Sequence, residues 1–211
     1  MLPRFSKDAS IEEAYALFER YVAEVPAALD RLRDLLARST DPRFHSAVLD
    51  LSPGSLATLW EYVLLFLDRF RRRTWSQRFL SSIGFKGLVA AADPRDPASI
   101  DRVLADPDLR DLLDHVACYL GEAFRRSFPG SRHRLGSSSA RGRTSLYGRL
   151  PVVADLPWER EACPDAIVTR LARRALRMES AAPQARAMLR EALEDYRRPP
   201  RAEGRPGPDG S

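Results

Sequence analysis

The residues best suited to bind a partner are arginines that cluster near the middle of the chain. The span from Ala123 to Ala154 carries a formal charge of +7, because it holds seven arginines and no acidic residue. A guanidinium group presents a planar fork of donors that matches the oxygens of a carboxylate or a phosphate. The seven are Arg125, Arg126, Arg132, Arg134, Arg141, Arg143 and Arg149.

Five of these arginines form the predicted partner- or anion-binding site: Arg132, Arg134, Arg141, Arg143 and Arg149. If Arg132 and Arg134 share one face of a strand and Arg143 lies on its neighbour, that face presents several forks to an anion. An acidic protein surface and a nucleic acid both fit this description. Only Phe128 and Tyr147 are interleaved, which is few for a sheet that stacks RNA bases. Alternatively, acidic residues on the helices neutralise the face; the candidates are Glu159, Glu161, Glu191 and Glu194.

Catalytic and metal-binding patterns are weak by comparison. His115 and Cys118 lie one helical turn apart, but their position near the edge of an apolar stripe favours packing over a Cys–His nucleophile. The other cysteine and histidines are scattered, so we expect no zinc site. No phosphate-binding or nucleophile-elbow motif occurs, and we expect no cofactor. Glu122 lies opposite the apolar stripe of its predicted helix, which places it in solvent, paired with Arg126.

The composition is that of a globular chain long enough to bury a core. The 211 residues are 44% hydrophobic and 30% charged, with a formal net charge of +5. Of the 34 basic residues 32 are arginine, and this excess runs through the whole chain, so GC-rich codon usage explains it as readily as anion recognition does. Two cysteines, no signal-peptide pattern at the start and no long apolar run predict a cytoplasmic protein without a membrane span.

Hydrophobic periodicity and helix boundary residues predict a chain dominated by helices. A capping box at Ser10 and Glu13 opens a long helix that continues past Pro26. Further helices follow Pro53, Pro97, Asp106, Pro164 and Pro183, and a buried strand is plausible over Phe44–Leu51. The Arg69–Arg73 run is expected at the negative end of a helix dipole, in preference to a binding patch. The region Trp75–Ala92 is ambiguous, because its apolar spacing suits a helix but Gly84 and Gly87 weaken that prediction.

Short segments after Pro129-Gly130 predict a small antiparallel sheet: 131–135, 143–147 and 150–154. The expected fold is therefore α+β, predominantly helical, with this sheet packed against helices. One domain is expected over residues 1–197, followed by a disordered Pro/Gly-rich tail over 198–211.

Two short segments resemble uncharacterised bacterial proteins of an actinobacterial type. Leu49-Asp50-Leu51-Ser52-Pro53-Gly54-Ser55-Leu56 is similar to their LDxSPxSL helix start, and Tyr119-Leu120-Gly121-Glu122 to their YLGE passage from a helix to a strand. The strand that follows lacks the tryptophan common in such proteins. The resemblance implies a small α+β scaffold of the kind that serves as an immunity protein, an adaptor or another partner-binding module.

The leading functional prediction is a non-catalytic, cytoplasmic protein-interaction module that uses a basic strand and loop surface to bind a partner with an acidic surface. The alternatives are a nucleic-acid-binding protein that uses residues 125–149, and an enzyme of unknown type.

Overall fold

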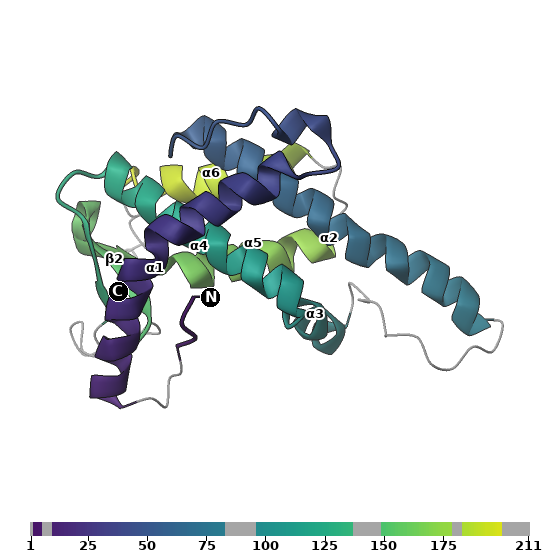
Figure 1. Ribbon diagram of the computed structural model, residues 1–211, viewed down its shortest axis with the longest axis horizontal. Helices are drawn as coiled ribbons and strands as arrows, with labels where there is room; N and C mark the ends of the chain where they lie inside the picture. The colour runs from purple at the N-terminus through teal and green to yellow at the C-terminus, as the bar shows by residue number, and fades with distance from the viewer. Residues whose placement is uncertain (1, 6–9, 83–95, 137–148, 179–182, 200–211) are drawn as a thin grey trace, which may run out of the picture.

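In the part of the chain that the computed structural model describes, six α-helices pack together and a three-stranded antiparallel sheet lies to one side of them, which confirms the α+β prediction (Figure 1). The described residues are 2–5, 10–82, 96–136, 149–178 and 183–199. The helices are α1 (Ile11–Ala37), α2 (Pro53–Ser82), α3 (Pro97–Leu104), α4 (Pro107–Ser127), α5 (Pro164–Arg177) and α6 (Pro183–Glu194). The strands are β1 (Arg132–Leu135), β2 (Pro151–Leu156) and β3 (Arg160–Ala162). Two 3-10 turns, η1 (Pro42–Phe44) and η2 (Pro157–Glu159), complete the described elements.

Local capping fixes most helix starts where the sequence predicts them. Ser10 and Glu13 form the predicted capping box, with N–H···O distances of 2.7 and 3.1 Å, and α1 continues through Pro26 as one helix. The carboxylates of Asp96 and Asp106 accept backbone N–H groups at the starts of α3 and α4. Each of these contacts joins residues at most three positions apart, so it can form independently of what packs around the helix.

Helix α4 is the central element, and α1 crosses it in Figure 1. It contacts α1, α2, α3, α5, α6 and β2. Twelve of its residues are buried, and they include residues outside the apolar stripe, such as His115, Cys118 and Gly121. From His115 to Phe124 every residue except Glu122 is buried, whereas Asp111, Arg125 and Arg126 are exposed. The predicted division into a core side and a water side is therefore wrong for the middle of α4.

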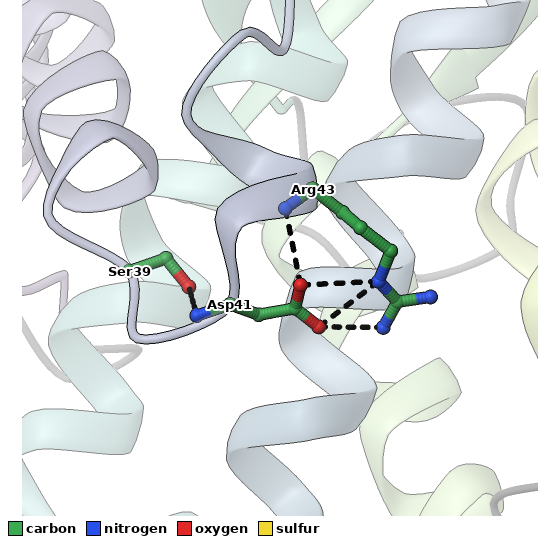
Figure 2. A network of polar contacts seen from close by, with 3 residues as sticks. All are labelled: Ser39, Asp41 and Arg43. Carbon is green, nitrogen blue, oxygen red and sulfur yellow. Dashed lines mark hydrogen bonds and ion pairs between the residues drawn. The ribbon is translucent and has the colours of Figure 1, made fainter.

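The predicted strand over Phe44–Leu51 is also wrong, because the segment opens with η1 instead. Figure 2 shows the cause: the Asp41 carboxylate accepts from the backbone N–H of Arg43 and from its guanidinium, at 2.6 to 3.1 Å. The hydroxyl of Ser39 in turn accepts the N–H of Asp41 at 3.2 Å. The side chains of Ser39 and Asp41 accept hydrogen bonds from nearby backbone N–H groups. These bonds stabilise a turn, which competes with an extended strand.

Helix α2 is longer than expected. It continues to Ser82, so the Arg69–Arg73 run lies inside the helix and not at its C-terminal end. The macrodipole explanation of that run is therefore wrong, since the dipole effect is confined to the last turn. The rest of the ambiguous Trp75–Ala92 region lies outside the described residues, as do the predicted 143–147 strand and most of the predicted tail. None of the described helices is long and apolar enough to cross a membrane.

The sheet has the order β1-β2-β3 and lies beside the C-terminal half of α4. Central strand β2 pairs with β1 in the register Arg132↔Ala154 to Leu135↔Pro151. It pairs with β3 through Val153↔Ala162 and Leu156↔Arg160, with an irregularity between these pairs. The strands β1 and β2 confirm two of the predicted segments, whereas the short β3 has no counterpart in the sequence prediction.

Candidate functional site

Two of the five predicted site arginines lie on β1 and are paired with carboxylates of the neighbouring strands. Arg132 and Arg134 are two residues apart and therefore share the outer face of the sheet. Nε of Arg132 lies 2.9 Å from the Asp155 carboxylate, and Arg134 forms an ion pair with Glu161. Two acids that balance this face, Asp155 and Glu161, thus come from the sheet, and Glu161 is one of the four candidates named from the sequence.

Of the remaining three site arginines, the structure describes Arg149. Arg149 has its backbone at the base of the segment that follows β1, where its N–H donates to the carbonyl of Gly136 at 3.2 Å. Its φ is +66°, a strained value for a residue other than glycine. Arg141 and Arg143 lie outside the described residues.

The turn between β2 and β3 is a functional candidate that sequence reasoning missed. Three non-glycine residues there have left-handed backbones: Asp155 at φ +58°, Trp158 at +66° and Glu159 at +54°. Each such residue costs on the order of 1 kcal/mol, and strained positions of this kind cluster at functional sites. The Trp158 side chain is 55% exposed. The only hint in the sequence was Pro157-Trp158 directly after an apolar strand.

Contacts on both sides hold this turn in place. Arg132 contacts Asp155 on the β1 side. On the other side, the Arg160 guanidinium donates to the Asp195 carbonyl at 3.1 Å and lies 5.7 Å from the centre of the Tyr196 ring. The residues on either side of Trp158 are therefore held in place, and its side chain projects from a fixed turn.

Glu122 is half-buried and bonded to β1, which corrects the expectation of a solvated carboxylate beside Arg126. Nε2 of His133 donates to Oε1 of Glu122 at 2.8 Å, and the two side chains are 6% and 18% exposed. The ion-pair partner on the helix is Arg125, at 3.0 Å. The sequence argument failed because α1 and β1 cover the side of α4 that was taken to face water.

The same layer contains Tyr21 from α1 and Cys118 from α4. The rings of Tyr21 and His133 meet edge to face, with centroids 5.9 Å apart. Burial raises the pKa of Tyr21 well above its ordinary value, and burial raises the pKa of Cys118 to about 12. A thiol with that pKa is protonated at neutral pH and is a poor nucleophile.

His115, the other member of the Cys–His pair considered from the sequence, bonds to the backbone of α4. Nδ1 of His115 donates to the carbonyl of Asp111, within its own helix. Within the described part of the chain no hydrogen bond joins His115 to Cys118, and no group of three or more His, Cys, Asp or Glu residues could hold a metal ion. The arrangement therefore supports packing at both positions, as the sequence favoured.

The Glu122–His133 contact makes stability depend on pH. Burial alone would raise the pKa of Glu122, but the hydrogen bond and positive charge of His133, with Arg125, outweigh it and hold that pKa below its ordinary value of 4.5. A carboxyl group with a lowered folded-state pKa stabilises the fold above its unfolded pKa, and this contribution is lost as the pH falls through the folded-state pKa.

Replacing Glu122 with glutamine is therefore expected to lower the free energy of unfolding by about 1.5 kcal/mol near neutral pH, the size of one hydrogen bond to a charged group. The difference from the wild type should shrink as the pH falls below 4.5. Urea unfolding across this pH range measures it, with Glu19→Gln on the exposed side of α1 as the control. A difference that stays constant with pH would contradict the assignment.

The two segments that resemble bacterial proteins contact each other in the fold. The Tyr119 hydroxyl accepts the N–H of Leu51 and bonds the Ser55 hydroxyl, both at 2.6 Å. Leu51 has a φ of +62°, so this contact fixes the chain at a strained position just before α2. Tyr119, Gly121 and Glu122 thus join α4 to the start of α2 and to β1, which is a scaffold role.

Comparisons of the chain with protein-family models, with curated proteins and with solved structures find no match.

Proposed function

We propose that the protein is a non-catalytic, cytoplasmic protein-interaction module that binds an acidic partner through the outer face of its small sheet. The contact surface consists of the β2–β3 turn with Trp158, together with Arg132 and Arg134 on β1. The observation that carries the proposal is Trp158, a large aromatic side chain that is exposed from a strained, braced turn.

An exposed tryptophan on a sheet that also carries Arg132 and Arg134 has the composition of an interface hot spot. Tryptophan buries a large area with few rotatable bonds, and arginine supplies several donors from one planar group. A fixed backbone lowers the entropy cost of binding, because the side chain is already presented before the partner arrives. The left-handed backbone at Trp158 works against stability, so its presence supports a role in binding.

The ion pairs on β1 are compatible with an acidic partner. The Arg132 contact with Asp155 uses Nε, one of the five N–H donors that a guanidinium carries. A carboxylate of the partner can accept hydrogen bonds from the remaining N–H groups of Arg132 without breaking that contact. The internal pairing of Arg132 and Arg134 supports a nucleic-acid partner less well, because the affinity of such proteins depends on the net positive charge offered to phosphates.

Replacing Trp158 with asparagine is expected to abolish partner binding while preserving the fold. Asparagine tolerates a left-handed backbone better than other non-glycine residues, so this variant should be about 1 kcal/mol more stable than Trp158→Ala. Loss of a hot-spot side chain costs at least about 2 kcal/mol of binding energy, which is a reduction in affinity of more than tenfold.

The measurement is recovery of a partner by the full chain and its variants from lysate of the source organism, with and without nuclease treatment. Val48→Asn is the matched control, because Val48 is another exposed apolar side chain, on the segment before α2. We expect recovery with the wild type and with this control, loss with Trp158→Asn, and weakening when Arg132, Arg134, Arg141 and Arg143 are all replaced by alanine. Equal recovery with Trp158→Asn, or a retained species that nuclease removes, would contradict the proposal.

A further inference from the structure

A cavity lies apart from the outer face of the sheet, between residues 2–5 and helices α1, α3, α4 and α5. Its volume is about 480 Å³, within the range of small-molecule sites. The lining comes from residues 2–5, α1, α3, α4, α5 and the start of β2. Apolar side chains form much of the wall: Leu2, Phe5, Tyr21, Leu104, Ala117 and Pro164.

One side of the cavity carries an excess of negative charge. Arg110 on α4 is shared by two carboxylates, with Asp114 at 2.9 Å and Asp165 at 2.8 Å. A second pair, Arg173 and Asp101 at 2.6 Å, balances itself and is more exposed. Arg4 also lines the cavity but is exposed, so solvent and salt screen its charge. Arg173 also lies on α5, but its partner Asp101 comes from α3. Within the cluster around Arg110, two carboxylates therefore share one guanidinium group.

Asp114 is the carboxylate whose charge is least well compensated. Its side chain is 20% exposed, and burial raises its pKa to about 6 even though Arg110 acts in the opposite direction. Asp165 and Asp111 add to the rise, while His115 opposes it. The other titratable or charged residues that line the cavity are Arg4, Tyr21, Asp101 and Arg173, and Cys118 contacts Tyr21.

We propose that this cavity binds an organic amine with an apolar body, with Asp114 and Asp165 as the counter-ions of the ammonium group. A cation placed beside these carboxylates supplies the compensation that one shared arginine does not. The apolar wall buries the body of the ligand. An organic anion placed beside Asp114 and Asp165 would be repelled by their charges. A neutral ligand would displace water from Asp114 without supplying a positive charge in its place.

Three probes with one indole body and different head groups test the charge preference on the full chain: tryptamine, tryptophol and indole-3-acetate. Ligand-observed NMR titrations give the dissociation constants. We expect tryptamine to bind at least about fivefold more tightly than tryptophol near pH 7.5, a difference of about 1 kcal/mol, and indole-3-acetate to bind most weakly. Equal affinities, a preference for the acid, or no detectable tryptamine binding would each overturn the proposal.

The pH dependence and one pair of variants locate the site. Tryptamine keeps its charge between about pH 5 and about pH 7.5, as amines do, whereas Asp114, with its pKa of about 6, becomes largely protonated at the lower value. The preference for tryptamine should therefore shrink at the lower pH. Asp114→Asn should remove both the preference and its pH dependence while leaving tryptophol affinity within about twofold.

The matched control is Asp111→Asn, on the same helix, exposed and outside the cavity lining, which should retain the preference. A preference that survives Asp114→Asn would place the amine elsewhere and overturn the assignment. The head-group comparison on the wild type is independent of how either variant folds.

Discussion

Replacing Phe124 with alanine is expected to lower the free energy of unfolding by about 4 kcal/mol, the middle of the range for deleting a buried phenylalanine ring. Phe124 is fully buried in the last turns of α4. Its ring lies 4.9 Å from the ring of Tyr196 and 6.1 Å from that of Phe128, measured between centroids. The cavity left by the substitution would remove contacts from α4 and from the chain after α6 together.

Urea denaturation at neutral pH measures this loss, and the thermal midpoint should fall by about 12 °C for a chain of this size. Val48→Ala removes an exposed side chain and should change stability by less than about 0.5 kcal/mol. A loss below about 1 kcal/mol for Phe124→Ala would mean that the site collapses around the missing ring, and would contradict its place at the centre of the core.

Replacing Gly121 with valine is expected to destabilise the protein by about 3 kcal/mol, because two costs combine there. A Cβ atom at Gly121 would lie 3.0 Å from Cε1 of His133 and 3.4 Å from Cγ of Pro164. His133 cannot move aside freely, since it is bonded to Glu122 and packed against Tyr21. The substitution would therefore overpack the α4–β1 contact and break a half-buried charged hydrogen bond.

Gly54→Val provides the matched control. Gly54 lies in the first turn of α2, and the nearest side-chain atom to a Cβ there is 3.6 Å away, which is ordinary contact. Valine is a slightly better helix former than glycine, so this variant should be within about 0.5 kcal/mol of the wild type. Equal stabilities for the two valine variants would show that β1 adjusts to a side chain at Gly121.

Gly121 and Phe124 belong to the same helix, and their contacts show how α4 connects the other elements of the fold. Tyr119 bonds to the chain before α2, and Gly121 leaves room for His133 of β1. Glu122 bonds to His133, and the Phe124 ring packs against Tyr196 in the chain after α6. Four positions within six residues thus connect the helix to separate parts of the chain. The YLGE segment is explained by these contacts without any catalytic role.

Local features of this protein could be predicted from its residues with good accuracy. The starts of α1, α3 and α4 follow from Ser10, Asp96 and Asp106, because a capping side chain bonds backbone groups two or three positions away. Two of the three strands match short segments predicted after Pro129-Gly130. These interactions need no distant part of the chain, so the sequence pattern contains all that they require.

The features that matter for function depend on residues far apart in the chain. Glu122 looked solvated because the helical period places it opposite an apolar stripe, but α1 and β1 cover that side. The pairing of Arg132 with Asp155 required the register of two strands, and the exposure of Trp158 required the β2–β3 turn between them.

The cavity shows the same dependence most clearly. Arg110 and Asp114 are neighbours on α4, and their spacing alone predicts an ordinary surface ion pair. Asp165 comes from α5, more than 50 residues later, and its approach gives the shared guanidinium a second carboxylate. Periodicity describes one helix at a time, whereas burial and charge balance are set by whichever elements pack against it.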